Sequence, residues 1–83
     1  MAATPTDLTI RLARELHRRQ ARYDSRPRGW TKLIRTQVDG ELLGLRVALG
    51  MALGHEAASG NVVPAAWDFY LQWLDAGMPE VMP

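Results

Sequence analysis

WTKLIRTQVDGELLGLRVALGMALGHEA, residues 30–57, is the segment on which the architecture of this chain depends. One broad side of it is apolar at helical spacing and consists of Trp30, Ile34, Val38, Leu42, Leu45, Leu49 and Leu53. The other side is apolar or small and consists of Leu33, Gly40, Leu43, Gly44, Val47, Met51 and Gly54. A helix that is apolar nearly all round is normally buried on more than one side. The segment therefore predicts the long central helix of an all-α protein.

The glycines of this segment leave two architectures open. Each glycine costs a helix about 1 kcal/mol relative to alanine. The helix either continues through Gly40, straight or bent, or breaks there with Asp39 as the cap of a new helix. The first alternative gives a three-helix bundle and the second a four-helix bundle.

Two further helices are predicted on either side of the central one. Residues 7–24 place Leu8, Leu12, Leu16 and Tyr23 on one face, and a break follows at residues 25–29. Residues 64–76 begin with a proline at the first helical position and end before Gly77, a suitable C-cap. The tail, residues 77–83, contains two prolines and is expected to be extended.

The length of the chain favours a single domain that needs support. We expect residues 1–83 to form one helical domain, and a chain of this size buries a limited fraction of its surface. The sequence contains no cysteine, so disulfides cannot stabilise it. Two histidines make a zinc site improbable on ligand number. We therefore expect the bundle to be completed by self-association, with a homodimer as the simplest form.

Charge is distributed unevenly along the sequence. Residues 1–38 hold nine of the ten basic residues, whereas residues 39–83 hold six of the nine acidic ones. The arginine row consists of Arg11, Arg14, Arg18 and Arg22 at helical spacing, extended by Arg26 and Arg28 in the following loop. Such a row is a solvated face, a binding site for nucleic-acid phosphates, or a binding site for an acidic protein surface, including a second copy.

Two apolar features indicate contact surfaces. Gly40, Gly44 and Ala48 are four residues apart, a spacing that lets another helix approach closely, either within the molecule or in a homodimer seam. The aromatic residues of the third helix are candidates for the core. A small domain has limited interior, however, so we also expect a partner to be bound by a set consisting of Trp67, Phe69, Tyr70, Trp73 and Met78.

No pattern in the sequence indicates catalysis. His55-Glu56 lacks the second histidine of a zinc-protease motif, and no glycine pattern follows a strand as a phosphate-binding loop requires. A helix-turn-helix across residues 55–73 is excluded, because its second helix would carry Asp68 and no basic residue. We therefore expect no enzyme activity, no catalytic residue, no metal and no cofactor.

The sequence gives no membrane or export signal and favours a binding function. The first residues lack the charged start and apolar core of a signal peptide, and no apolar run reaches the length of a membrane span. We expect a cytoplasmic, non-catalytic interaction or regulatory protein that docks on a macromolecular partner. The alternative is a nucleic-acid-binding accessory factor that uses the arginine row. Head-to-tail contact between the basic and acidic halves is a third hypothesis.

Overall fold

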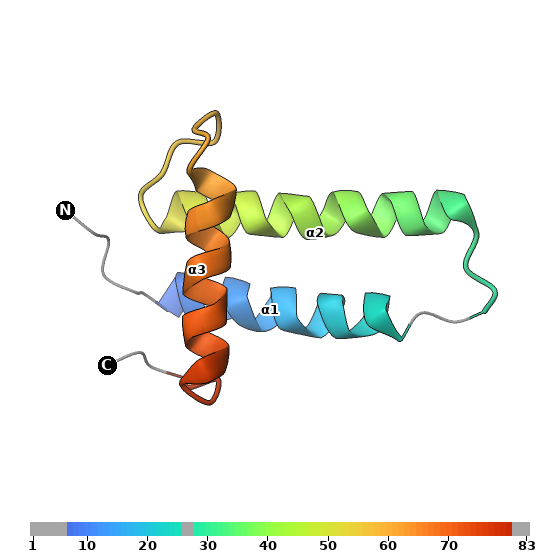
Figure 1. Ribbon diagram of the computed structural model, residues 1–83, viewed down its shortest axis with the longest axis horizontal. Helices are drawn as coiled ribbons and strands as arrows, with labels where there is room; N and C mark the ends of the chain where they lie inside the picture. Colours follow the sequence, from blue (N-terminus) through green and yellow to red (C-terminus); the bar gives the residue numbers. More distant parts are fainter. Residues whose placement is uncertain (1–6, 26–27, 81–83) are drawn as a thin grey trace.

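The computed structural model describes residues 7–25 and 28–80, and this part of the chain forms three α-helices without a strand. They are α1 (Asp7–Asp24), α2 (Lys32–Ala52) and α3 (Val62–Asp75). α1 and α2 lie side by side and antiparallel, and α3 crosses the pair near the start of α1 and the end of α2 (Figure 1). The predicted all-α bundle is confirmed.

The ends of α2 follow from local chemistry. The Thr31 hydroxyl accepts a hydrogen bond from the Ile34 amide at 3.2 Å and caps the helix start. The helix continues unbroken through Gly40, so residues 7–25 and 28–80 form three helices rather than four. It stops before the expected end at residue 57, because Gly54 adopts a φ of 98° and the His55 amide donates back to the Gly50 carbonyl at 3.0 Å.

α3 ends in the same way as α2. Gly77 adopts a φ of 89°, as its position predicted, and the Met78 amide donates to the Trp73 carbonyl at 2.9 Å. Met78 itself has a φ of 57° and is left-handed rather than extended. The indole N–H of Trp73 donates to the Pro79 carbonyl at 2.9 Å, which fastens the following segment to α3. Residues 81–83 of the expected extended tail lie outside the described part.

The core lies where α3 crosses the helix pair. Its buried side chains come from all three helices: Ile10, Ala13, Leu16, Leu42, Leu49, Ala66, Phe69, Tyr70 and Trp73. Leu8 was expected on the buried side of the first helix but is exposed, and Ile10 is buried instead. The reason is that α1 faces both α2 and α3, so its buried sector is broader than one leucine stripe and lies to one side of it.

A close contact between backbones joins the end of α2 to the start of α3. Gly50 is buried, and a Cβ atom placed on it would collide with the carbonyl group of Val62. Only a residue without a side chain fits here, and this glycine sets how closely α3 approaches α2.

Arg46 occupies the junction of the three helices. It donates to the Gln20 side chain on α1 at 3.1 Å, and its guanidinium lies 5.2 Å from the ring centroid of Trp67 on α3. Its Nε atom is buried without a hydrogen-bond partner. The long side chain thus contributes contacts to both neighbours of α2.

Candidate functional site

The arginine row lies on the exposed side of α1. Arg11, Arg14, Arg18 and Arg22 are all exposed, as is Arg28, whereas Arg26 lies outside the described residues. Within residues 7–25 and 28–80, Arg11, Arg14 and Arg22 form no ion pair. These three guanidiniums are therefore available to an anionic partner.

Carboxylates neutralise the positive charge at one point along α1. Glu15 accepts from Arg18 at 2.6 Å and from Arg19 at 2.7 Å, and Arg19 reaches across to Glu41 of α2 at 2.8 Å. The hydrogen bond from Arg19 is the main reason that the pKa of Glu15 is lowered, with Arg18 adding to it. The same bond is the main cause of the raised pKa of Arg19. All four side chains face solvent, so the network orients the arginines more than it stabilises the fold.

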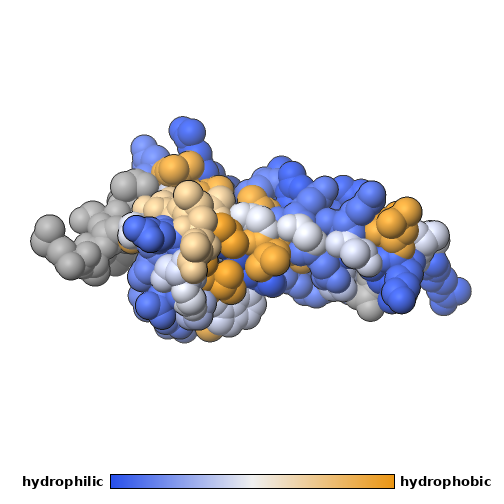
Figure 2. Space-filling view, turned by 90° about the horizontal axis from the view of Figure 1, so that it is seen from above, coloured by the Kyte–Doolittle hydropathy of each residue, from blue (hydrophilic) through white to orange (hydrophobic). Residues whose placement is uncertain are grey.

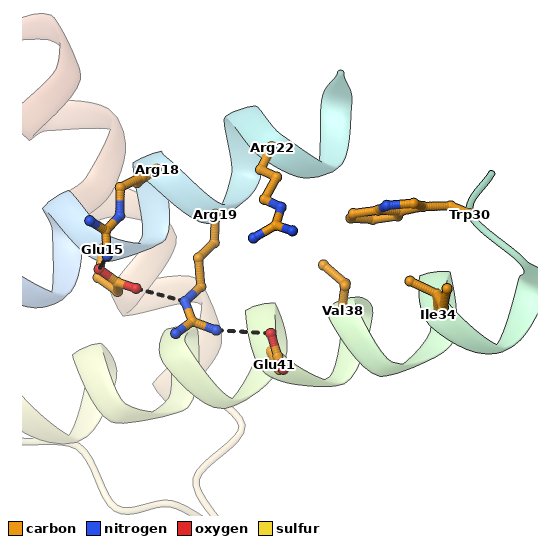
Figure 3. A pocket seen from close by; sticks show the side chains of 8 residues that line it. All are labelled: Glu15, Arg18, Arg19, Arg22, Trp30, Ile34, Val38 and Glu41. Carbon is orange, nitrogen blue, oxygen red and sulfur yellow. Dashed lines mark hydrogen bonds and ion pairs between the residues drawn. The ribbon is translucent and has the colours of Figure 1, made fainter. Parts of the chain in front are cut away.

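A groove opens between α1 and α2 (Figure 3). It lies on the part of the helix pair that α3 does not cross in Figure 1. Its volume is about 690 Å³. We call it the hairpin groove, and its lining consists of Glu15, Arg18, Arg19, Arg22, Trp30, Ile34, Val38 and Glu41.

The two sides of the hairpin groove differ in chemistry. The apolar wall consists of Ile34 and Val38 on α2 and Trp30, which precedes the helix. The arginines come from α1. In Figure 3 the Arg22 side chain extends from α1 toward α2 and lies beside the Trp30 ring. The groove therefore suits a surface that combines apolar and anionic groups. Sequence reasoning missed it, because Trp30 and Ile34 were assigned to the buried side of the central helix.

The predicted aromatic surface of the third helix is mostly core. Phe69, Tyr70 and Trp73 are buried, with Trp73 only 2% exposed, so these three are wrong as partner-binding residues. They share a side of α3 that faces the helix pair, since positions 69, 70 and 73 follow helical spacing. Trp67, at 39%, and Met78 remain exposed and available to a partner.

Tyr70 is linked to α1 through a histidine that the sequence did not single out as a packing residue. Nδ1 of His17 lies 3.1 Å from the Tyr70 hydroxyl, and its ring meets Trp73 edge-on at 6.1 Å between centroids. Burial is the main cause of the raised pKa of Tyr70; the charge of Asp24 adds to it, and Arg46 opposes it. The pair fastens α3 to α1 and is part of the packing.

The predicted seam of small residues does not pack within the molecule. Gly40 and Gly44 are exposed, and nothing lies within 4 Å of a Cβ placed on either of them. Ala48 is half-buried. The close helix contact in this molecule is at Gly50 instead. The intramolecular interpretation of Gly40 and Gly44 is therefore wrong.

These glycines belong to an exposed side of α2 that carries no charged residue. We call it the outer face of α2, and it consists of Leu33, Gly40, Leu43, Gly44, Val47 and Met51. Leu33 is 68% exposed, and Leu43 and Met51 are each 51% exposed. Figure 2, seen from the side of α2, shows orange and pale residues along this helix with blue residues beside them. Exposed apolar side chains gathered on one face are typical of a contact surface.

Across 7–25 and 28–80, no three side chains among histidine, cysteine, aspartate and glutamate gather where they could hold a metal ion. No helix in these ranges has the length and apolarity to cross a bilayer.

Comparison with known proteins found no matching protein family, no matching curated protein and no matching solved structure.

Proposed function

We propose that this chain is a non-catalytic interaction protein that docks on another macromolecule through the outer face of α2. The observation that carries this proposal is the exposure of Leu33, Leu43 and Met51, each half or more, on a side of the helix without charge. Covering such side chains removes apolar surface from water, which stabilises a complex by about 25 cal/mol per Å² before the costs of association.

The glycines of this face support a helical partner. Gly40 and Gly44 lower the helical propensity of α2 without any packing benefit inside the molecule. Because these two positions have no side chain, the backbone of α2 is accessible there. A second helix can approach the backbone closely there.

A second copy of the chain is the partner that this face fits best. Leu33 and Met51 lie equally far from Leu42 along the helix, and so do Gly40 and Gly44. Consider two antiparallel copies of α2 that meet through their outer faces, with the twofold axis at the level of Leu42 along the helix. Gly40 of one copy would then face Gly44 of the other, and Leu33 would face Met51. Since the face is uncharged, this pairing brings no like charges together.

The test is the effect of Leu43→Lys on self-association. At high salt, we expect sedimentation equilibrium to show a dimer for the unmodified chain and a monomer for this variant, because a lysine in the seam would lose hydration without gaining a partner. Leu8→Lys is the matched control, since Leu8 is 55% exposed but lies on α1; it should remain dimeric. If both variants dimerised equally, the outer face of α2 would not be the dimer contact.

A second candidate function is binding to the backbone of a nucleic acid. It is favoured by Arg11, Arg14 and Arg22, which are exposed and form no ion pair in the described part of the chain. Arginines along one helix neutralise phosphates without reading bases, so binding would be independent of sequence and would weaken steeply with salt.

Salt dependence tests this second candidate. Each neutralised phosphate contributes about −0.9 to the slope of log K against log salt concentration on duplex DNA. Arg11→Gln combined with Arg14→Gln should therefore make the slope shallower by about 2. Arg35→Gln, which removes an exposed arginine of α2 instead, should leave the slope unchanged. Failure of the unmodified chain to bind duplex DNA at low salt would exclude this function.

A further inference from the structure

The hairpin groove is a concave surface that the described residues leave open. α3 lies across the opposite part of the helix pair and does not cover it (Figure 1). Arg22 is exposed and makes no ion pair among the described residues, and the apolar wall of Trp30, Ile34 and Val38 is incompletely buried. The groove therefore presents positive charge and apolar surface together.

The outward side of α3 has the complementary chemistry. Trp67 and Leu71 are exposed and one helical turn apart, and Asp68 and Asp75 lie beside them, also exposed. α3 contains no basic residue. We call this set the acidic face of α3. It joins apolar and anionic groups, as the groove requires.

We propose that molecules of this protein join head to tail, with the acidic face of α3 of one copy lying in the hairpin groove of the next. Trp67 and Leu71 would cover the apolar wall of the groove, and Asp75 would approach Arg22. Charge complementarity identifies the occupant. Glu15 and Glu41 pair with Arg18 and Arg19 inside the groove, which leaves Arg22 without a carboxylate among the described residues, and the acidic face supplies carboxylates. This contact goes beyond the pairing through α2 and uses different residues.

The contact has consequences that a twofold pair does not share. The two surfaces differ, so each molecule keeps one of them free after pairing, and assembly continues into rings or chains. The charged groups stand at the surface, so salt weakens the contact by screening them. Pairing through the uncharged outer face of α2 lacks this sensitivity.

Charge reversal tests the proposal on full-length chains that carry Leu43→Lys, so that pairing through α2 is absent. At low salt, this parent is expected to form species larger than a dimer in sedimentation velocity, and to become monomeric at high salt. Arg22→Glu and Asp75→Arg, each alone, should weaken assembly about tenfold or more, since each brings like charges together. Neither side chain has an ion pair in the described structure, so both variants should keep the helical circular dichroism of the parent.

Restoration gives the decisive outcome. Combining Arg22→Glu with Asp75→Arg in one chain, or mixing the two single variants, should restore assembly because the charges are then opposite again. Arg35→Glu is the matched control, since it reverses an exposed arginine outside the groove and should assemble like the parent. A parent that stays monomeric at low salt overturns the proposal, as does a double variant that remains monomeric. Loss of DNA binding by Arg22→Glu with no change in assembly would assign the groove to nucleic acid and would also overturn it. None of these outcomes affects the dimer test of the outer face.

Discussion

Replacing Trp73 with alanine is expected to abolish the cooperative thermal unfolding transition, or to lower its midpoint by about 12–40 °C. Trp73 is 2% exposed, packs against Tyr70 and His17, and donates its indole N–H to the Pro79 carbonyl. Truncating a buried aromatic side chain costs about 3–5 kcal/mol. A domain of this size has about 5 to 10 kcal/mol of stability, and each kcal/mol shifts the midpoint by about 4–8 °C.

Trp67→Ala is the matched control for this prediction. Trp67 lies on the same helix but is 39% exposed, and its ring lies at the edge of the core, against Arg46 and Tyr70. Its removal should lower the free energy of unfolding by about 1 kcal/mol, because it removes a cation–π contact and a partly buried aromatic ring. Circular dichroism at 222 nm during heating measures both variants. Equal midpoints would show that the two tryptophans are equally buried, against the packing described above.

The second large effect is expected from alanine at Gly50. The added methyl group would meet the Val62 carbonyl, so α3 must shift away from α2 or leave it. Overpacking of this kind costs about 1–3 kcal/mol, and the obstacle here is backbone, which cannot rotate aside. The gain in helical propensity from glycine to alanine, about 1 kcal/mol, offsets part of this cost. Because backbone cannot give way, we place the cost at the upper end of this range, about 3 kcal/mol, and expect a net loss of about 2 kcal/mol in the free energy of unfolding by urea.

Gly44→Ala should have the opposite sign. Nothing lies within 4 Å of a Cβ at Gly44, so the substitution adds helical propensity without a collision. The expected gain is about 0.5–1 kcal/mol, measured in dilute solution where the chain is monomeric. If alanine destabilised both positions alike, the close approach of α3 at Gly50 would be contradicted.

The bounds of α1 and the end of α3 could be predicted from the sequence, because they depend on local chemistry, whereas the prediction that α3 begins at Pro64 is wrong, since it begins at Val62. α1 covers the predicted residues, and Gly77 ends α3 as expected. Gly54 shows the limit of this reasoning. It was counted among the glycines inside the central helix, but its positive φ terminates α2. A glycine near the end of a helical pattern is either interior or a C-cap, and the pattern alone does not separate the two.

The buried sides of the helices could be predicted only in part, because they depend on how the helices cross. α2 is apolar on two sides, and no periodicity tells which side α1 and α3 cover. On α3 the spacing of Ala66, Phe69, Tyr70 and Trp73 contained the answer, since these buried residues follow one another at three- and four-residue intervals. The hairpin groove could not be predicted, because it is formed jointly by α1, α2 and the loop residue Trp30.

Because α3 lies at one end of the helix pair, that end should be more stable against local unfolding than the other. Near α3, Leu16 and Leu49 are enclosed by three helices. At the end of α1 and the start of α2, by contrast, α3 does not cross the helix pair (Figure 1). Amide hydrogens of residues 20–25 and 32–36 should therefore exchange with solvent far sooner than those beside the core, through local fraying that leaves the crossing intact. A partner bound in the hairpin groove would therefore also slow the exchange of amide hydrogens in the last turn of α1 and the first turn of α2, so binding and local stabilisation of these two turns would occur together.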